Sequence, residues 1–488
     1  MRSNLFILIF VIVLTSSCTP IFTPEVTLPT STADRSLSTV NLTSLGETST
    51  PTITSSPVNH DQLNISSTGP WLAFATNEGL WAINPDGSGL RKLYAFSEFP
   101  VYGLSFQAAP QGGILVFAEP STRSHYPDPY LGEDLYLFIV DFPDTDPHPL
   151  TALTSRDILD QIVESSPLEE IDIEQSAWWK TEQILAAVSR PGSLAWSPNS
   201  DNVAFSASLD GPSSDVYLLD VRSDSLLRLT SGLTQATNLS WSPDGEFIIH
   251  KAVSDINVGR SGPGLIVDGL WAAPADGSEP RFLTEGDATP IGWLTANQVV
   301  IQHYSMPCDL YDLELINVST GNRTMLWEGA FHSAALDPES GTILLGNPHE
   351  IEADNPFCQQ VNPSGLYIIS PPSTTPLRIG EYSNPDYFQS IRWFQEPQCF
   401  LVPAYSRTMC FSSAGELQEL NLSDTAFLKE RIFASSSYCI FSEALDGSAI
   451  AFSDDSTIYV ASQPDFQPDP IIEDLTDVCR FDLEWVPD

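Results

Sequence analysis

Two stretches of the chain share one pattern: SLAWSPNSDNVAFS at Ser193–Ser206 and NLSWSPDGEFIIHK at Asn238–Lys251. Each pattern predicts a strand, a Ser-Pro-Asp/Asn turn and a second apolar strand. In the turn, Pro243 fixes the first dihedral angle and Asp244 favours the second. Gly245 then accepts the positive φ that begins the return strand. The two stretches therefore predict a repeated β-hairpin.

The repeat continues with two more strands. Asp215–Asp220 (DVYLLD) alternates as a third strand should, and Ser225–Thr230 (SLLRLT) supplies a fourth. Its final Leu-Thr recurs at Leu283–Thr284. Four short strands in about 45 residues form the repeat of a β-propeller blade. We therefore predict an all-β fold, a propeller of four-stranded blades.

The first strand of each blade contains a position by which successive blades can be aligned. Tryptophan occupies one position of this strand at intervals of one or two repeat lengths, at Trp196, Trp241, Trp293, Trp393 and Trp485. Each double interval has room for a degenerate blade, marked by Leu336 and by Glu443. Phe106 extends the series toward the N-terminus. Eight blades result, and the sequence alone leaves seven open.

The two ends of the repeat region complement each other. Trp71–Thr76 and Gly79–Asn84 have the pattern of second and third strands, and no first strand precedes them. Asp482–Val486 has the pattern of a first strand, with no second strand after it. We expect it to pair beside Trp71–Thr76 and close the ring, because closure removes exposed strand edges.

These repeats resemble the TolB-like family of WD-type propellers over about residues 69–488. That family carries a W-S-P-D-G turn, which Trp241–Gly245 matches fully and Trp196–Asn199 nearly. Val216–Asp220 (VYLLD) is similar to the family's I-Y-x-x-D strand. The small α/β domain that precedes the propeller in TolB has no counterpart here. The resemblance therefore implies the fold but does not carry the family's partners over.

One stretch, residues 155–190, breaks the strand pattern. It predicts a helical insertion of two short helices separated by Pro167. Such an insertion is either a lid or partner-docking element, or a plug that covers apolar surface. Large aromatic side chains dominate binding hot spots, so Trp178 and Trp179 are the candidate partner-binding residues.

The N-terminus has the pattern of an export signal, predicted over residues 1–17. Arg2 precedes ten apolar residues, Leu5–Leu14, which are too few to span a bilayer. Cys18 follows small residues, which resembles the lipobox of bacterial lipoproteins, with Thr15 where that motif usually has Leu. We expect a lipid on Cys18; the alternative is plain secretion with an unmodified cysteine.

Residues 18–68 are rich in Ser, Thr and Pro, a composition typical of a disordered tether. The expected domains are therefore a signal peptide, this lipidated tether, and a propeller over 69–488. The expected location is exported: the outer face of the cell membrane, the periplasm or the extracellular space.

Charge narrows the range of partners. The chain has 63 acidic and 20 basic side chains, for a formal net charge of −43. Such a protein repels phosphate backbones and anionic headgroups, which excludes nucleic acid. Contact with the membrane is expected through the lipid anchor only. The remaining partners are extracellular or envelope proteins and glycans.

The chain has seven cysteines, and six remain after Cys18. Export permits disulfides. The blade register suggests three pairs, the alternative being buried free thiols. The pairs are Cys399 with Cys410, Cys308 with Cys358, and Cys439 with Cys479.

No catalytic motif emerges from the sequence. It has no G-x-S-x-G nucleophile elbow, P-loop, dinucleotide fingerprint or Cys/His zinc spacing.

Some TolB-like propellers are glycan lyases that hold a metal with clustered histidines, and His250, His303 and His349 fall in successive blades. We predict no catalytic, metal or cofactor-binding residue, and a non-catalytic scaffold that binds protein or glycan at the cell surface. The alternative is a metal-dependent lyase or hydrolase of extracellular glycan.

Overall fold

A computed structural model provides the structure of the protein. It describes residues 65–97, 100, 103–121, 134–165, 177–256, 265–305, 310–329, 331, 333–347, 363–382, 391–394, 398–404, 407–418, 441–444, 446–453, 456–462, 467–475 and 483–488. Contacts divide the chain into residues 1–58 and 59–488, and the described residues all belong to the second unit. The predicted signal peptide, Cys18 and nearly all of the tether lie outside them. In the described part, neither helix has the length and apolar character to cross a membrane.

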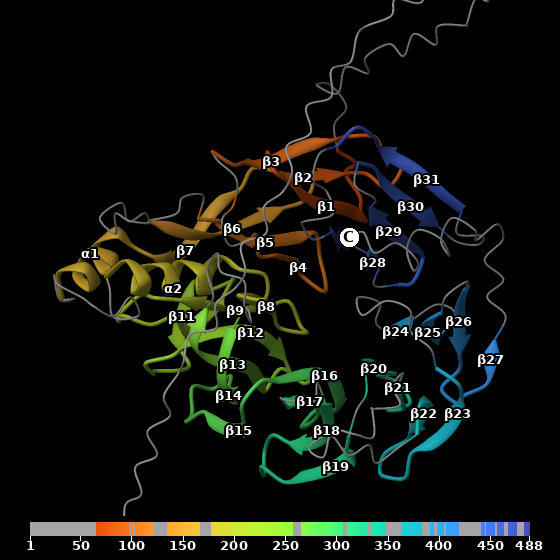
Figure 1. The fold of residues 1–488 in the computed structure, drawn as a ribbon. Coiled ribbons are helices and arrows are strands. Elements are labelled where there is room, and N and C mark those ends of the chain that lie inside the picture. The colour runs from red at the N-terminus through yellow and green to blue at the C-terminus, as the bar shows by residue number, and fades with distance from the viewer. Residues whose placement is uncertain are drawn as a thin grey trace, which may run out of the picture. The chain divides into compact units, whose positions relative to one another are not determined.

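Within the described residues, the chain forms eight antiparallel sheets of four strands, which follow one another around a ring (Figure 1). From the innermost strand outward, blade 1 contains β32 (Leu483–Val486), β1 (Trp71–Thr76), β2 (Gly79–Ile83) and β3 (Arg91–Ala95). Blade 2 contains β4 (Phe106–Ala108), β5 (Ile114–Ala118), β6 (Leu135–Asp141) and β7 (His148–Thr154). Blade 3 contains β8 (Leu194–Trp196), β9 (Asn202–Ala207), β10 (Asp215–Asp220) and β11 (Ser225–Arg228). Blade 4 contains β12 (Gln235–Trp241), β13 (Phe247–Ile256), β14 (Leu265–Pro274) and β15 (Arg281–Glu285).

The second half of the ring repeats this order. Blade 5 contains β16 (Ala288–Thr295), β17 (Gln298–Ser305), β18 (Leu310–Asn317) and β19 (Arg323–Trp327). Blade 6 contains β20 (Ser333–Leu336), β21 (Ile343–Asn347), β22 (Gly365–Ile369) and β23 (Leu377–Gly380). Blade 7 contains β24 (Arg392–Phe394), β25 (Cys399–Ala404), β26 (Arg407–Phe411) and β27 (Leu417–Gln418). Blade 8 contains β28 (Phe441–Glu443), β29 (Ala449–Ser453), β30 (Ile458–Ser462) and β31 (Gln467–Ile472). The prediction of eight blades is confirmed.

The predicted closure of the ring is also confirmed. β32 pairs antiparallel with β1, with Trp71 opposite Val486 and Phe74 opposite Leu483. The end of the chain therefore supplies the innermost strand of the blade that the start of the repeat region leaves incomplete (Figure 1). Trp485 and Val486 are buried, so the closing strand is part of the core.

Tryptophan indoles link successive innermost strands. Trp241 Nε1 donates to the carbonyl of Ala195 at 2.9 Å, and Trp485 Nε1 donates to the carbonyl of Ser442 at 3.1 Å. Trp196 Nε1 donates in the same way to the carbonyl of a blade 2 residue, Gln107, at 3.1 Å. At Trp196, Trp241 and Trp485, the tryptophan that marks the sequence register thus fastens one blade to the preceding one. The buried Nε1 of Trp293 has no hydrogen-bond partner among the described residues.

The register in blade 2 differs from the prediction by two residues. After the marker position, the next residue donates its N–H across the hairpin: Ser197 to Asn202 O, and Ala109 to Ile114 O. Ala108 therefore holds the position equivalent to Trp196. Phe106 lies two residues earlier on the same strand, β4. The prediction placed the marker at Phe106 because that is the large side chain of the strand, whereas the position equivalent to Trp196 holds a small residue, Ala108.

The Ser-Pro turn has the predicted geometry. Gly245 has φ of 73° and donates its N–H to Ser242 O at 3.0 Å. The Ser242 hydroxyl donates to Asp244 Oδ1 at 2.6 Å and accepts the N–H of Phe247 at 2.9 Å. The turn is thus closed by its own side chains, as the sequence motif requires.

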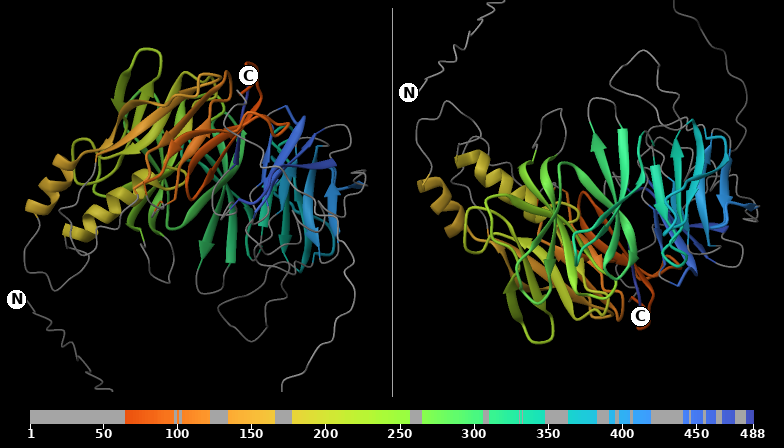
Figure 2. Two further views of the ribbon diagram at one scale, coloured as in Figure 1. Left: turned by 90° about the horizontal axis from the view of Figure 1, so that it is seen from above. Right: turned by 90° about the horizontal axis from the view of Figure 1, so that it is seen from below.

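Residues 155–190 contain the two predicted helices, α1 (Arg156–Ser165) and α2 (Ala177–Ser189), beside blades 2 and 3 (Figure 2). Every side chain of α2 from Thr181 to Ser189 is buried. Ile184 and Leu185 join the hydrophobic cluster of blades 2 and 3. The insertion therefore has the character of the plug rather than of an exposed docking element.

Polar contacts also fix α2 to blade 4. Gln183 Nε2 donates to the carbonyl of Ile256 at 2.8 Å, and the N–H of Ile256 donates back to Gln183 Oε1. Trp179 is 6% exposed, so its ring lies inside the protein and is not presented to a partner. The side chain of Trp178 lies outside the described residues.

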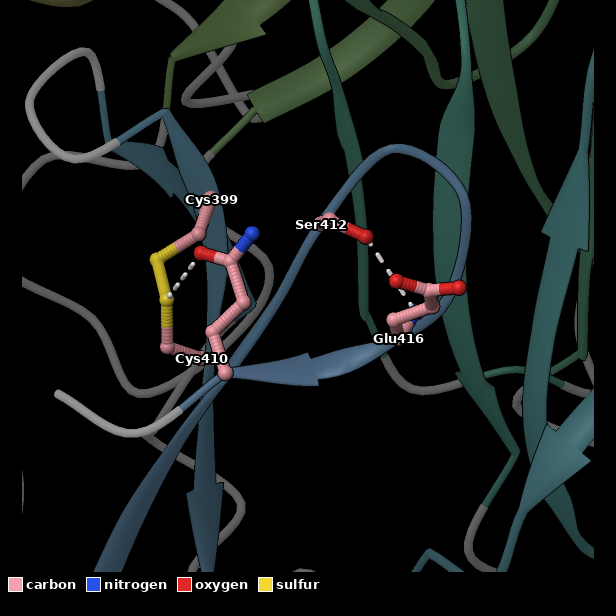
Figure 3. Close-up of a disulfide and its surroundings, with 5 residues drawn as sticks. Cys399, Cys410, Ser412 and Glu416 are labelled. Atoms are coloured by element: carbon pink, nitrogen blue, oxygen red, sulfur yellow. Dashed lines mark hydrogen bonds between the residues drawn. A yellow bond between two sulfur atoms is a disulfide. The ribbon is translucent and has the colours of Figure 1, made fainter.

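One predicted disulfide is present: Cys399 in β25 and Cys410 in β26 are joined, with their Cα atoms 5.6 Å apart (Figure 3). The pairing is diagonal, because Leu401 is the residue opposite Cys410 in the ladder. In the turn that follows, the hydroxyl of Ser412 accepts the N–H of Glu416 at 3.2 Å. The other four cysteines, Cys308, Cys358, Cys439 and Cys479, lie outside the described residues.

The closing strand yields a stability prediction. Trp485→Ala removes a buried ring and its hydrogen bond, so the free energy of unfolding should fall by about 3–5 kcal/mol. Trp485→Phe keeps a ring but leaves the Ser442 carbonyl without its donor, which should cost about 1 kcal/mol. Urea unfolding followed by circular dichroism measures both. Leu377→Ala, at a side chain 62% exposed, is the control and should change little. Equal stability of Trp485→Ala and wild type would contradict the role assigned to the indole.

Candidate functional site: a pocket between blades 3 and 4

A pocket of about 410 Å³ lies between blades 3 and 4. We call it the blade 3–4 pocket. Its blade 4 wall is formed by residues of all four strands, with Ala236 from the first, and its blade 3 wall by β10 and by the segment that leads from β11 to β12.

Three side chains form a row across the blade 4 wall. His250 in β13 lies opposite Trp271 in β14, which lies opposite Phe282 in β15. Directly paired residues of neighbouring strands point to the same face of a sheet. The rings of Trp271 and Phe282 meet edge to face, with centroids 5.2 Å apart. The row is therefore aromatic at β14 and β15 and polar at β13, the innermost of these three strands.

Two small residues lie beside this row, and one of them, Ala252, lines the pocket. Ala252 and Gly269 are the next pair along β13 and β14 on the same face. A Cβ at Gly269 would come within 2.8 Å of Phe282 Cε2 and 2.5 Å of the Thr284 carbonyl. The ring of Phe282 thus approaches the glycine backbone closely, and a side chain there would displace it.

The blade 3 wall is held by a buried carboxylate. Asp215 accepts hydrogen bonds from Arg228 Nη2 at 2.6 Å and from the Thr230 hydroxyl at 2.9 Å. Burial raises the pKa of Asp215, and both hydrogen bonds act against that rise. Arg228 also pairs with Asp210 at 2.9 Å. This network fixes the wall before any ligand arrives.

His250 is the unusual polar group of the pocket. Its side chain is 4% exposed, and its Nδ1 has no hydrogen-bond partner among the described residues. Burial lowers its pKa to about 4, because the charged imidazolium loses its hydration. The ring is therefore neutral at physiological pH, a poor proton acceptor that can still form a hydrogen bond.

The pocket mouth is acidic and apolar. Asp268 and Glu279 are exposed and form no ion pair with any residue that the structure describes. Phe282 is 43% exposed. Leu233, between two lining residues of the β11–β12 segment, is 92% exposed. An exposed rim of this kind is typical of a ligand site.

A larger hollow of about 750 Å³ lies between blades 2 and 3, at the hairpin turns. Its charged lining residues are Asp141, Arg222 and Asp224, and Arg222 is already paired with Asp201 at 2.6 Å. No Phe, Tyr or Trp lines it. The blade 3–4 pocket is therefore the better candidate.

The histidines considered for a metal site are placed as follows. His303 in β17 lies 3.2 Å from Glu314 Oε2 and is 18% exposed. His250 lines the blade 3–4 pocket, and His349 lies outside the described residues. Within the described part of the chain, no three His, Cys, Asp or Glu side chains gather to hold a metal ion.

Sequence reasoning singled out His250 but missed Trp271 and Phe282. The signal that identifies them is the strand register, which aligns residues far apart in the chain. A pattern of alternating residues shows that each one lies in a strand. It does not show which of them lie side by side.

The fold defines the class of protein, an eight-bladed β-propeller. No family model matches the chain. Solved structures to which the chain is similar include TolB from Acinetobacter baumannii, at 14% identity and a TM-score of 0.31, covering 65% of this chain and 66% of that one. Porphyromonas gingivalis dipeptidyl peptidase 4 matches at 9% identity and a TM-score of 0.49, covering 84% and 59%. Pyrococcus horikoshii acylaminoacyl peptidase matches at 11% identity and a TM-score of 0.40, covering 76% of this chain and 52% of that one. The chain thus spans about half to two thirds of the length of these proteins, and the likeness concerns the fold alone.

The state of His250 yields a pH prediction. Its folded pKa of about 4 lies below the ordinary value of 6.5, so only the unfolded chain takes up this proton as the pH falls from 6.5 to 4. Over that window, the unfolding free energy of wild type should fall by about 3 kcal/mol relative to His250→Gln. Urea unfolding from pH 7 to pH 4 measures the difference. His250→Phe is a second variant that cannot titrate at this position. Whatever its packing cost, its unfolding free energy should follow the same pH profile as that of His250→Gln. Parallel pH profiles for wild type and both variants would refute the assignment.

Proposed function

We propose that the protein is an exported, lipid-anchored propeller that acts as a binding scaffold at the cell surface, with the blade 3–4 pocket as its ligand site. Its ligand is a group on an extracellular or envelope protein or glycan. The observation that carries the proposal is the row His250, Trp271 and Phe282, which opens between two carboxylates.

The construction of the pocket favours binding. Asp215 is held by Arg228 and Thr230, and Trp271 is held by the ladder and by Phe282. A site that is formed in advance loses little conformational entropy when it binds. Pockets that bind ligands combine apolar walls with a few placed polar groups, which is the composition found here.

The electrostatics also favour binding over proton-transfer chemistry at this site. A general base works best with a pKa near the operating pH. The pKa of His250, about 4, is well below neutral pH. Its neutral ring is suited to orienting a ligand through a hydrogen bond.

The location of the protein rests on its N-terminal sequence. A lipid on Cys18 and a Ser/Thr/Pro-rich segment over 18–68 would tether the propeller at the membrane and let its faces reach partners. We expect the mature N-terminal peptide to begin at Cys18 and to carry a lipid, as measured by mass spectrometry. Cys18→Ala should move the protein from the membrane to the soluble fraction. A mature N-terminus downstream of residue 18 would refute lipidation.

Site-directed photo-crosslinking tests the ligand site. A photoreactive phenylalanine analogue replaces Phe282 in the full chain, which is then irradiated in its native membrane fraction. Met325 lies on the fourth strand of blade 5 and is also 43% exposed, so it is the matched control position. We expect discrete adducts from position 282 and few from position 325. Equal labelling at both positions, or none at either, would refute the assignment of this pocket.

A further inference from the structure

Blades 1 and 4 share a second repeat, which runs through their third and fourth strands without a gap. Glu78–Leu93 reads EGLWAINPDGSGLRKL, and Asp268–Leu283 reads DGLWAAPADGSEPRFL. The strand registers agree as well. The third-strand tryptophan lies opposite a fourth-strand residue in both blades, Lys92 in blade 1 and Phe282 in blade 4. The two segments are therefore structurally equivalent, position by position.

In blade 1, this segment holds an ammonium group of the protein itself. Lys92 Nζ lies 4.3 Å from the centroid of the Trp81 ring and 3.5 Å from Glu78 Oε2. The ring supplies a cation–π contact, and the carboxylate supplies the countercharge. Blade 1 thus shows how this repeat binds an alkylammonium group.

In blade 4, the receptor residues remain and the lysine does not. Asp268 stands where blade 1 has Glu78, and Trp271 stands where it has Trp81. Phe282 replaces Lys92. On the second strand, His250 and Ala252 occupy the positions of Phe74 and Thr76. The smaller side chains leave room, and the blade 3–4 pocket lies beside the tryptophan.

We propose that the blade 3–4 pocket binds an external alkylammonium group in the manner in which blade 1 holds Lys92. This inference rests on the proposed function, because it names the chemistry of that site's ligand. Such a group occurs on lysine side chains of proteins and on free polyamines.

The charges around the pocket support a cationic ligand. Asp268 and Glu279 lack an ion-pair partner among the described residues, and no Lys or Arg lines the pocket. The net charge of −43 attracts cations toward the molecule. The buried ring of His250, whose Nδ1 has no partner among the described residues, adds a polar group at the inner end of the row.

Isothermal titration of the full chain with small probes tests the proposal. The probes are n-butylammonium, N-acetyl-lysine methylamide and spermidine, with 1-butanol and N-acetyl-norleucine methylamide as neutral counterparts. We expect each ammonium compound to bind at least about ten-fold more tightly than a neutral one of similar size. The order of affinity of the lysine amide and spermidine separates the two sources of the group.

Three variants locate the binding. Trp271→Ala and Asp268→Asn should each weaken n-butylammonium binding by about ten-fold, and Met325→Ala should leave it unchanged. Phe282→Lys restores the residue found in blade 1, so its own ammonium should occupy the site and abolish binding of the probe. Met325→Lys adds the same charge at an equally exposed position outside the pocket, so it is the control and should retain binding. Circular dichroism confirms that each variant is folded.

Two results would overturn the inference. One is n-butylammonium binding no tighter than 1-butanol, and the other is wild-type affinity in both Asp268→Asn and Phe282→Lys. Either result together with specific adducts from position 282 would leave the pocket as a ligand site for a different chemistry. Ammonium binding that depends on Trp271, without adducts at 282, would support the cation site and count against a macromolecular ligand.

Discussion

A hydrogen bond from a first-strand indole to the carbonyl of the preceding innermost strand fastens blades 3, 4 and 1 to their neighbours, and in blade 1 it secures the closure of the ring. A four-stranded blade cannot bury its two faces alone, so each needs a neighbour on both sides. Trp241 and Trp485 join adjacent blades in this way, and Trp485 does so on the strand that closes the ring. Because the ring is closed, each blade lies between two neighbours. The size of the side chains between two blades then decides whether a pocket remains there.

The blade 3–4 pocket is one such space, and its origin lies in a departure from the repeat. Blade 1 fills the equivalent position with Phe74, Trp81 and Lys92, whereas blade 4 has His250, Trp271 and Phe282. On the second strand, His250 is smaller than Phe74 and Ala252 is smaller than Thr76, which opens volume without disturbing the ladder, since the backbone bonds do not depend on side chains. The same framework can thus hold a lysine of the protein itself in one blade and form a candidate ligand site in another.

The helical insertion has one of the two roles that its composition left open, that of a plug. Ile184 and Leu185 of α2 are buried in the hydrophobic cluster of blades 2 and 3, and Trp179 is only 6% exposed. Gln183 adds two hydrogen bonds to the backbone of Ile256 at the far end of β13. The insertion therefore packs against blade 4 through the strand that carries His250, and it covers apolar surface that would otherwise face solvent.

The sequence alone predicted the all-β class, the four-stranded repeat and the closing strand, because these follow from local alternation, turn residues and a repeated tryptophan. It also identified the Cys399–Cys410 pair, whose partners are near in sequence. It misplaced the register at Phe106, where a small residue holds the marker position, and it offered Trp179 as an exposed anchor. Only the tertiary structure decided which side chains meet across strands and blades. His250, Trp271 and Phe282 lie on three strands and face a neighbouring blade, and their proximity depends on register and on packing between blades, which a one-dimensional pattern does not encode.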